Sequence, residues 1–249
     1  MELSLIFLVL GMVVLGAVAQ RVAGLGFAML ISPFLVLALG AHQGVFLVNI
    51  CGVVSSAFIV PRVWKNIDWS MFGWLVSFSV VGSVVGALMA GALPQAILSV
   101  VVGGVVLFAL LLSLVLLRAN VTVGGNSPKG AAGFLSGLTN ALAGVGGPAV
   151  SAYAVMARWP QRSFAATLQP FFVVTGLATV GMKFLTTPDQ LPELPGWAWI
   201  GVAVFIWAGV LIGEQVQRVV SDKHARFFVL CFAFFGAVTA LISGLLALK

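Results

Sequence analysis

Residues 95–117 have the sequence QAILSVVVGGVVLFALLLSLVLL, and this stretch decides the fold class of the chain. It contains no charged side chain and is long enough to cross roughly 30 Å of hydrocarbon as a helix. Similar stretches recur along the 249 residues, of which 61% are hydrophobic and 7% are charged. A soluble domain has roughly 45–50% apolar and 25% charged residues. Because the apolar stretches are continuous rather than alternating, they exclude a membrane β-barrel and predict an all-α, polytopic membrane protein.

Ten apolar segments are expected to be helices, although three of them are too short to span a membrane alone. The segments are 3–19, 27–40, 45–64, 70–90, 95–117, 130–142, 147–158, 163–185, 196–216 and 225–248. The short segments 27–40, 130–142 and 147–158 reach only about 18–21 Å at roughly 1.5 Å per residue. We therefore predict about eight to ten helices, some short or discontinuous, in two repeats of about five segments. The first repeat covers 1–117 and the second 130–249, with a cytoplasmic linker at 118–129.

A weak internal repeat relates the two halves. At an offset of 120 residues the amides match in two pairs, Gln20 with Asn140 and Asn49 with Gln169. At the same offset the glycine motif Ala23-Gly24-Leu25-Gly26 matches Ala143-Gly144-Val145-Gly146. Near an offset of 127 a second glycine pair matches, Gly82 and Gly86 with Gly209 and Gly213. The spacing of that pair lets membrane helices pack closely.

The charged residues between the segments predict how the halves are oriented. The net charge is +6, but the twelve basic residues stand in short clusters between apolar segments, which indicates topology rather than nucleic-acid binding. The loop after the third segment carries Arg62 and Lys65, whereas the corresponding loop of the second half carries Asp189 and Glu193. Because basic loops stay in the cytoplasm, the two repeats are predicted to be inverted, with both termini outside.

Two helices are predicted to begin in the membrane interior, directly after the glycine motifs. Their unpaired N–H groups and positive dipole ends, near Gly26 and Gly147, favour an anion at the repeat interface. Arg21 is the fixed positive charge nearby, so Arg21→Ala is predicted to abolish anion binding. The predicted substrate-binding residues are Gln20, Arg21, Gly24, Gly26, Asn49, Asn140, Gly144, Gly146, Gly147 and Gln169.

Other roles stay open for several of these residues. Glycine breaks in membrane helices can be packing contacts only. Arg21 can extend to the membrane surface if segment 3–19 spans the bilayer. Asn49 and Gln169 can serve as hydrogen bonds between helices. Three further polar residues are expected at loop ends or at the membrane interface: His42, Lys183 and Glu214.

No sequence motif indicates an enzyme, a cofactor or a metal site. The chain lacks HExxH, GxSxG and Walker A patterns, and its two histidines stand at opposite ends of the sequence. Cys51 and Cys231 lie inside apolar segments without ligand spacing, which favours packing. There is also no nucleotide-binding domain in this sequence, so we predict secondary or passive transport.

The glycine motifs resemble those of the sulfite exporter TauE/SafE family, whose members carry one at the start of each of two homologous halves. The resemblance covers essentially the full chain and rests on two stretches, Gln20-Arg21-Val22-Ala23-Gly24-Leu25-Gly26-Phe27 with Pro33 after it, and Ala143-Gly144-Val145-Gly146-Gly147-Pro148. It implies a secondary transporter of the inner cell membrane that exports sulfite, a sulfonate or another small organosulfur or carboxylate anion by alternating access. Its expected partners are the anion, the lipid bilayer and a coupling proton or sodium ion, with a homodimer left open. The alternatives are an anion channel of the same architecture and a membrane scaffold without a substrate.

Overall fold

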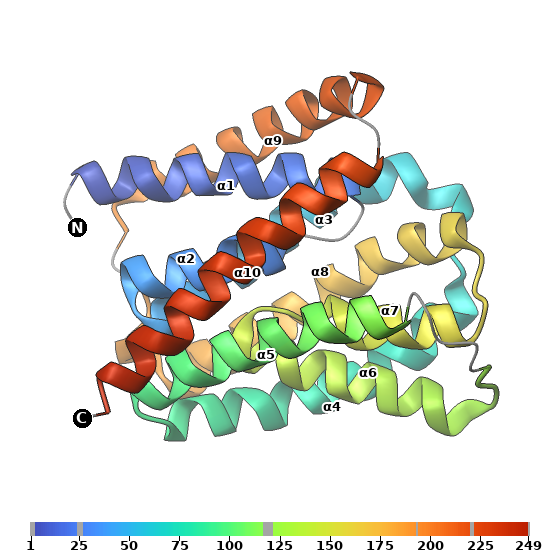
Figure 1. Ribbon diagram of the computed structural model, residues 1–249, viewed down its shortest axis with the longest axis horizontal. Coiled ribbons are helices and arrows are strands. Elements are labelled where there is room, and N and C mark those ends of the chain that lie inside the picture. Colours follow the sequence, from blue (N-terminus) through green and yellow to red (C-terminus); the bar gives the residue numbers. More distant parts are fainter. Residues whose placement is uncertain (1–2, 24–26, 117–121, 193, 220–221, 249) are drawn as a thin grey trace.

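The protein is a bundle of helices, seen in Figure 1 along its shortest axis. The computed structural model describes residues 3–23, 27–116, 122–192, 194–219 and 222–248, and contains no strand within these ranges. The helices are α1 (Leu3–Ala23), α2 (Phe27–Leu39), α3 (Ala41–Val63), α4 (Trp69–Ala92), α5 (Gln95–Leu116), α6 (Asn126–Ala143), α7 (Gly147–Met156), α8 (Gln161–Thr186), α9 (Gly196–Val219) and α10 (Asp222–Leu246), with 3-10 turns η1 (Trp64–Asn66) and η2 (Pro188–Gln190). Seven helices of the described residues are long and apolar enough to cross a membrane. The prediction of an all-α, polytopic membrane protein is confirmed.

Two helices begin earlier than the apolar pattern predicts, and a glycine stands before each start. Helix α3 begins at Ala41 rather than at residue 45, because Gly40 alone makes the turn after α2, with a φ of 87°. Helix α6 begins at Asn126, inside the predicted linker, after Gly125 with a φ of 97°. Pro128 fits the first turn of α6 because its missing N–H removes no intrahelical hydrogen bond there.

The two short segments after the glycine motifs fold back on the helices that precede them. Helix α2 packs against α1, and α7 packs against α6. Gly144 closes the turn after α6 in a left-handed conformation, and its N–H donates to the carbonyl oxygen of Asn140 at 2.8 Å. Helix α7 then begins at Gly147 with Pro148 in its first turn. The structure therefore contains V-shaped helix pairs rather than discontinuous spans; the first motif's Gly24-Leu25-Gly26 lies outside the described residues.

Glycines bring α4 into close contact with α6. A Cβ at Gly82 would lie 2.1 Å from the carbonyl oxygen of Phe134, and a Cβ at Gly137 would lie 1.9 Å from that of Ser79. The glycine pair of α9 contacts α1 in the same manner, with Cβ positions that would meet α1 atoms at 2.7 Å. The predicted close packing at both glycine pairs is confirmed.

The helices pair in the same way in both halves of the chain. Exchanging α1–α5 with α6–α10 turns the α4–α6 contact into the α9–α1 contact, and it leaves the α3–α8 and α5–α10 contacts unchanged. All four contacts are present. This is the pattern expected of two repeats related by a two-fold axis, so it supports the predicted repeat, while the inversion relative to the membrane stays a prediction.

Candidate functional site

A cavity of about 430 Å³ lies where the two helix hairpins meet α3, α8 and α10. The first residues of α2, Phe27 to Met29, line it, and so do Gly147 and Pro148 at the start of α7. The two helix starts singled out in the sequence therefore open onto one common space. Ligand pockets typically have about 300–1,000 Å³, so the cavity accommodates a small anion together with water.

Most of the predicted binding residues are brought together at this cavity. Those that line it are Gln20, Asn49, Asn140, Gly144, Gly146 and Gly147. Gln169 and Arg21 do not line it. The remaining two, Gly24 and Gly26, lie outside the described residues.

Asn49 of α3 and Asn140 of α6 form a buried pair at the cavity wall. Asn140 Nδ2 donates to Asn49 Oδ1 at 2.5 Å and to Thr179 Oγ1 at 3.2 Å. Asn49 Nδ2 donates to the carbonyl oxygens of Val45 at 2.9 Å and Asn140 at 3.3 Å. This hydrogen-bond network fixes both amides at the cavity wall. Asn49 links α3 to α6, which is one of the roles that the sequence leaves open for it.

Gln20 of α1 and Gln169 of α8 form the second amide pair. Gln20 Nε2 donates to Gln169 Oε1 at 3.3 Å and to Ser56 Oγ at 3.2 Å, while Ser55 Oγ donates to Gln20 Oε1 at 2.7 Å. Gln169 therefore accepts a hydrogen bond from Gln20 and links α8 to α1. The repeat offset of 120 residues exchanges this pair with the asparagine pair, which further supports the internal two-fold relation.

The turn before α7 supplies hydrogen-bond donors to the cavity. The N–H groups in the first turn of a helix have no intrahelical acceptor, and the helix dipole places positive potential at the same end. Ser136 Oγ holds the turn in place by donating to the carbonyl oxygen of Gly146 at 2.7 Å. None of the described residues that line the cavity is acidic. The electrostatic potential of this site therefore favours an anion.

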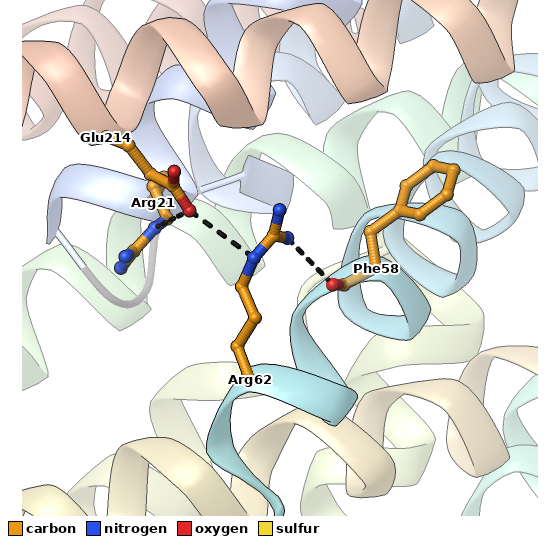
Figure 2. A network of polar contacts seen from close by, with 4 residues as sticks. All are labelled: Arg21, Phe58, Arg62 and Glu214. Atoms are coloured by element: carbon orange, nitrogen blue, oxygen red, sulfur yellow. Dashed lines mark hydrogen bonds and ion pairs between the residues drawn. The ribbon is translucent and has the colours of Figure 1, made fainter.

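Arg21 takes part in an ion-pair network away from the cavity (Figure 2). Its Nε lies 3.5 Å from Glu214 Oε1 of α9, and Arg62 Nε of α3 lies 3.5 Å from the same oxygen. Arg62 Nη1 also donates to the carbonyl oxygen of Phe58 at 2.9 Å. One carboxylate thus joins α1, α3 and α9, and the position of Arg21 gives no support to the predicted contact with the anion. Glu214, expected at the interface, is the centre of this network.

The cation that does line the cavity is Arg158, which sequence reasoning treated only as a topology signal. Arg158 lies between α7 and α8 with a φ of 51°, a left-handed conformation unusual for a residue other than glycine. Its neighbour Trp159 also lines the cavity, and the indole Nε1 is buried without a hydrogen-bond partner within the described structure. The sequence signal that could have found them is an Arg-Trp-Pro turn directly after the short helix α7.

Arg158→Ala is expected to weaken anion binding, whereas Arg21→Ala leaves it within about twofold of the unsubstituted protein. Because Arg158 is exposed at the cavity mouth, its effect is modest, roughly a threefold to tenfold higher Kd at low salt that shrinks as salt screens it. Isothermal titration of sulfite into both variants at two salt concentrations measures this. A larger loss in Arg21→Ala than in Arg158→Ala would return Arg21 to the site.

The fold and cavity define a class, the multi-pass helical membrane proteins with a cavity between helix hairpins. The chain matches the family described as Sulfite exporter TauE/SafE over residues 8–240, and it belongs to that family. Membership indicates a membrane transporter of sulfur-containing anions. No curated protein and no solved structure matches the chain significantly.

Proposed function

We propose that the chain is a secondary transporter that exports a small anion, such as sulfite, a sulfonate or another organosulfur or carboxylate anion, across the inner cell membrane. The observation that carries the proposal is the cavity shared by the two helix starts. It places the first-turn N–H groups of α7 and the guanidinium of Arg158 beside the hydrogen-bonded amides of α1, α3 and α6, and none of its described lining residues is acidic. Such donors match the oxygen atoms of a small oxyanion.

Alternating access is proposed because the cavity reaches only one end of the bundle. Among its described lining residues, Ser113 of α5, Gln161 of α8 and Val229 of α10 lie toward the side predicted as cytoplasmic. Toward the other end, α2, α3 and α5 are packed through fully buried side chains, among them Ala41, Val45, Leu98 and Val102. On this proposal the cavity faces the cytoplasm, as in an inward-facing transporter. A channel needs a path to both ends, so the closed end favours a transporter over the channel alternative.

Flux measurements in proteoliposomes test this proposal. Radiolabelled sulfite and sulfoacetate are expected to enter in a saturable manner and to exchange faster when the unlabelled anion is present on the opposite side. Taurine, which carries no net charge at neutral pH, is expected to be transported poorly. Comparing vesicles with and without pH or sodium gradients identifies the coupling ion. Non-saturable flux without exchange stimulation would support a channel, and no flux of any anion would leave only the scaffold.

A further inference from the structure

Two buried basic side chains lie beyond the closed end of the cavity. Lys183, near the end of α8, is 3% exposed, and His42, in the first turn of α3, is 9% exposed. The sequence predicted an interfacial lysine and a histidine at a loop end. Both residues lie at helix ends as expected, His42 directly after the Gly40 turn and Lys183 in the last turn of α8, but their side chains are buried in protein.

Neither side chain is fully paired within the described part of the chain. No described carboxylate lies within ion-pair distance of Lys183, and its ammonium group has no hydrogen-bond partner there. His42 Nε2 contacts the carbonyl oxygen of Leu93 at 3.2 Å, whereas Nδ1 is buried without a partner. Holding a lysine among packed helices without a counter-ion is costly. A fold keeps such a group when it has a function.

The two basic residues continue the helix faces that line the cavity. On α3, His42 stands seven residues before Asn49 and fourteen before Ser56, so all three lie on one face. On α8, Lys183 stands seven residues after Gly176 and shares its face. Asn49, Ser56 and Gly176 line the cavity. The basic pair therefore lies about 10 Å further along the same path, two helical turns beyond the asparagines.

A packed layer separates the basic pair from the cavity in this structure. Between them on α3 is Val45, which is fully buried, and on α8 is Thr179, which is fully buried and accepts from Asn140 Nδ2. At the outer end of α3, a Cβ at Gly40 would lie 2.6 Å from the Gln95 side chain, which shows how closely the start of α5 covers this region. Opening of the path at this end would expose the pair to the outer solution.

We propose that His42 and Lys183 form a second anion site at the outer end of the transport path, occupied by the same small oxyanion when the path opens outward. The inference rests on the proposed transport function. The ammonium group supplies three N–H donors, and a protonated imidazole adds Nδ1–H. A bound oxyanion offsets the repulsion between Lys183 and a protonated His42, so both groups can be positively charged when the anion is present.

Anion binding at this site takes up a proton. Because Nε2–H donates to the carbonyl oxygen of Leu93, Nδ1 carries a hydrogen only when the ring is protonated. Of the helices packed against α3, α2 and α5 contain no titratable residue. The titratable residues of α6 and α9 are Lys129, Glu214 and Arg218, and they lie at the opposite end of the bundle. On α8, Lys183 is the charged group that acts on His42. A proton bound together with each anion would couple transport to the pH gradient.

The experiment compares Lys183→Met and His42→Gln with the exposed control Lys65→Met in right-side-out vesicles. Both site variants are expected to raise the half-saturating concentration of external sulfite at least about tenfold, and to change the internal value less than about twofold. The control retains both values. In His42→Gln the proton taken up per anion is also expected to disappear.

Stability separates this role from a structural one. Because Met has a volume similar to Lys and removes a lone buried charge, Lys183→Met is expected to melt at the same or a higher temperature. A lower melting temperature with unchanged external half-saturation would overturn the second site and make Lys183 structural. If the unsubstituted protein moves no anion, the transport function itself fails, and the variants are not the cause. If transport is intact and both variants keep the external value, the second site alone is wrong.

Discussion

Asn140→Asp is expected to reduce anion affinity at least about a hundredfold while most of the protein stays folded. The substitution preserves the size of the side chain and replaces donor N–H groups with a negative charge at the wall of the cavity. Two like charges about 4 Å apart at an effective dielectric of about 20 repel by about 4 kcal/mol, and roughly 1.4 kcal/mol is tenfold in affinity. Titration with sulfite near pH 8, where the new carboxyl is ionised, measures the loss.

The fold can tolerate this change because the side-chain amide of Asn49 can rotate so that its nitrogen and oxygen exchange places. Asn49 now accepts from Asn140 Nδ2, and after rotation of its amide it can donate to the new carboxylate. Ser127→Asp is the matched control, since it adds the same charge to the exposed first turn of α6, where a negative charge favours the helix. Equal sulfite affinities for Asn140→Asp and Ser127→Asp would contradict placing the anion at the Asn49–Asn140 pair.

The fold class and the main breaks could be predicted from the sequence, because apolar length and glycine position act locally. A continuous apolar segment in a membrane must form a helix, and the glycine motif at 143–146 marks the turn of a helix pair. The first residues of the helices were harder to predict from the sequence. Asn126 and His42 are polar, so the apolar pattern excludes them, although one glycine with positive φ before each start is enough to begin the helix.

The sequence could predict residues that line the cavity where two distant segments share a polar residue, but not where the direction of a side chain decides. Gln20 and Arg21 are neighbours in the sequence, but successive residues of a helix point about 100° apart. Gln20 therefore faces the cavity and α8, whereas Arg21 faces Glu214 of α9. Which helix lies on which side of α1 depends on long-range packing that no local pattern records.

Lys183 illustrates the same limit for burial. A lysine two residues before the end of an apolar segment usually reaches water along the helix, so the sequence favours an interfacial position. In the structure α3 and α4 pack against α8, and the side chain is covered. The cover comes from residues more than 80 positions away, which is why only the three-dimensional arrangement reveals the basic pair.

Gly137→Ala is expected to destabilise the protein more than the same substitution at Gly73 or Gly209. The new Cβ would lie 1.9 Å from the backbone oxygen of Ser79, so α4 and α6 must separate, because a carbonyl cannot rotate away as a side chain can. Overpacking of this kind costs about 1–3 kcal/mol, and about 2–4 °C of melting temperature accompanies each kcal/mol in a chain of this size. Thermal unfolding in detergent measures the loss.

The internal repeat predicts the order in which three glycine-to-alanine substitutions lower the melting temperature. Gly73→Ala adds the same methyl group to α4 with no atom within 4 Å, and it is expected to leave the melting temperature unchanged or higher. Gly209→Ala, at the related contact of α9 with α1, should fall between the two. There α1 already carries Ala17 where α6 has Gly137, and the new Cβ would meet Ala17 Cβ at 2.7 Å rather than a carbonyl at 1.9 Å. The looser α1–α9 contact therefore accommodates a methyl group at lower cost. Equal losses for Gly73→Ala and Gly137→Ala would mean that close α4–α6 packing does not hold the bundle together.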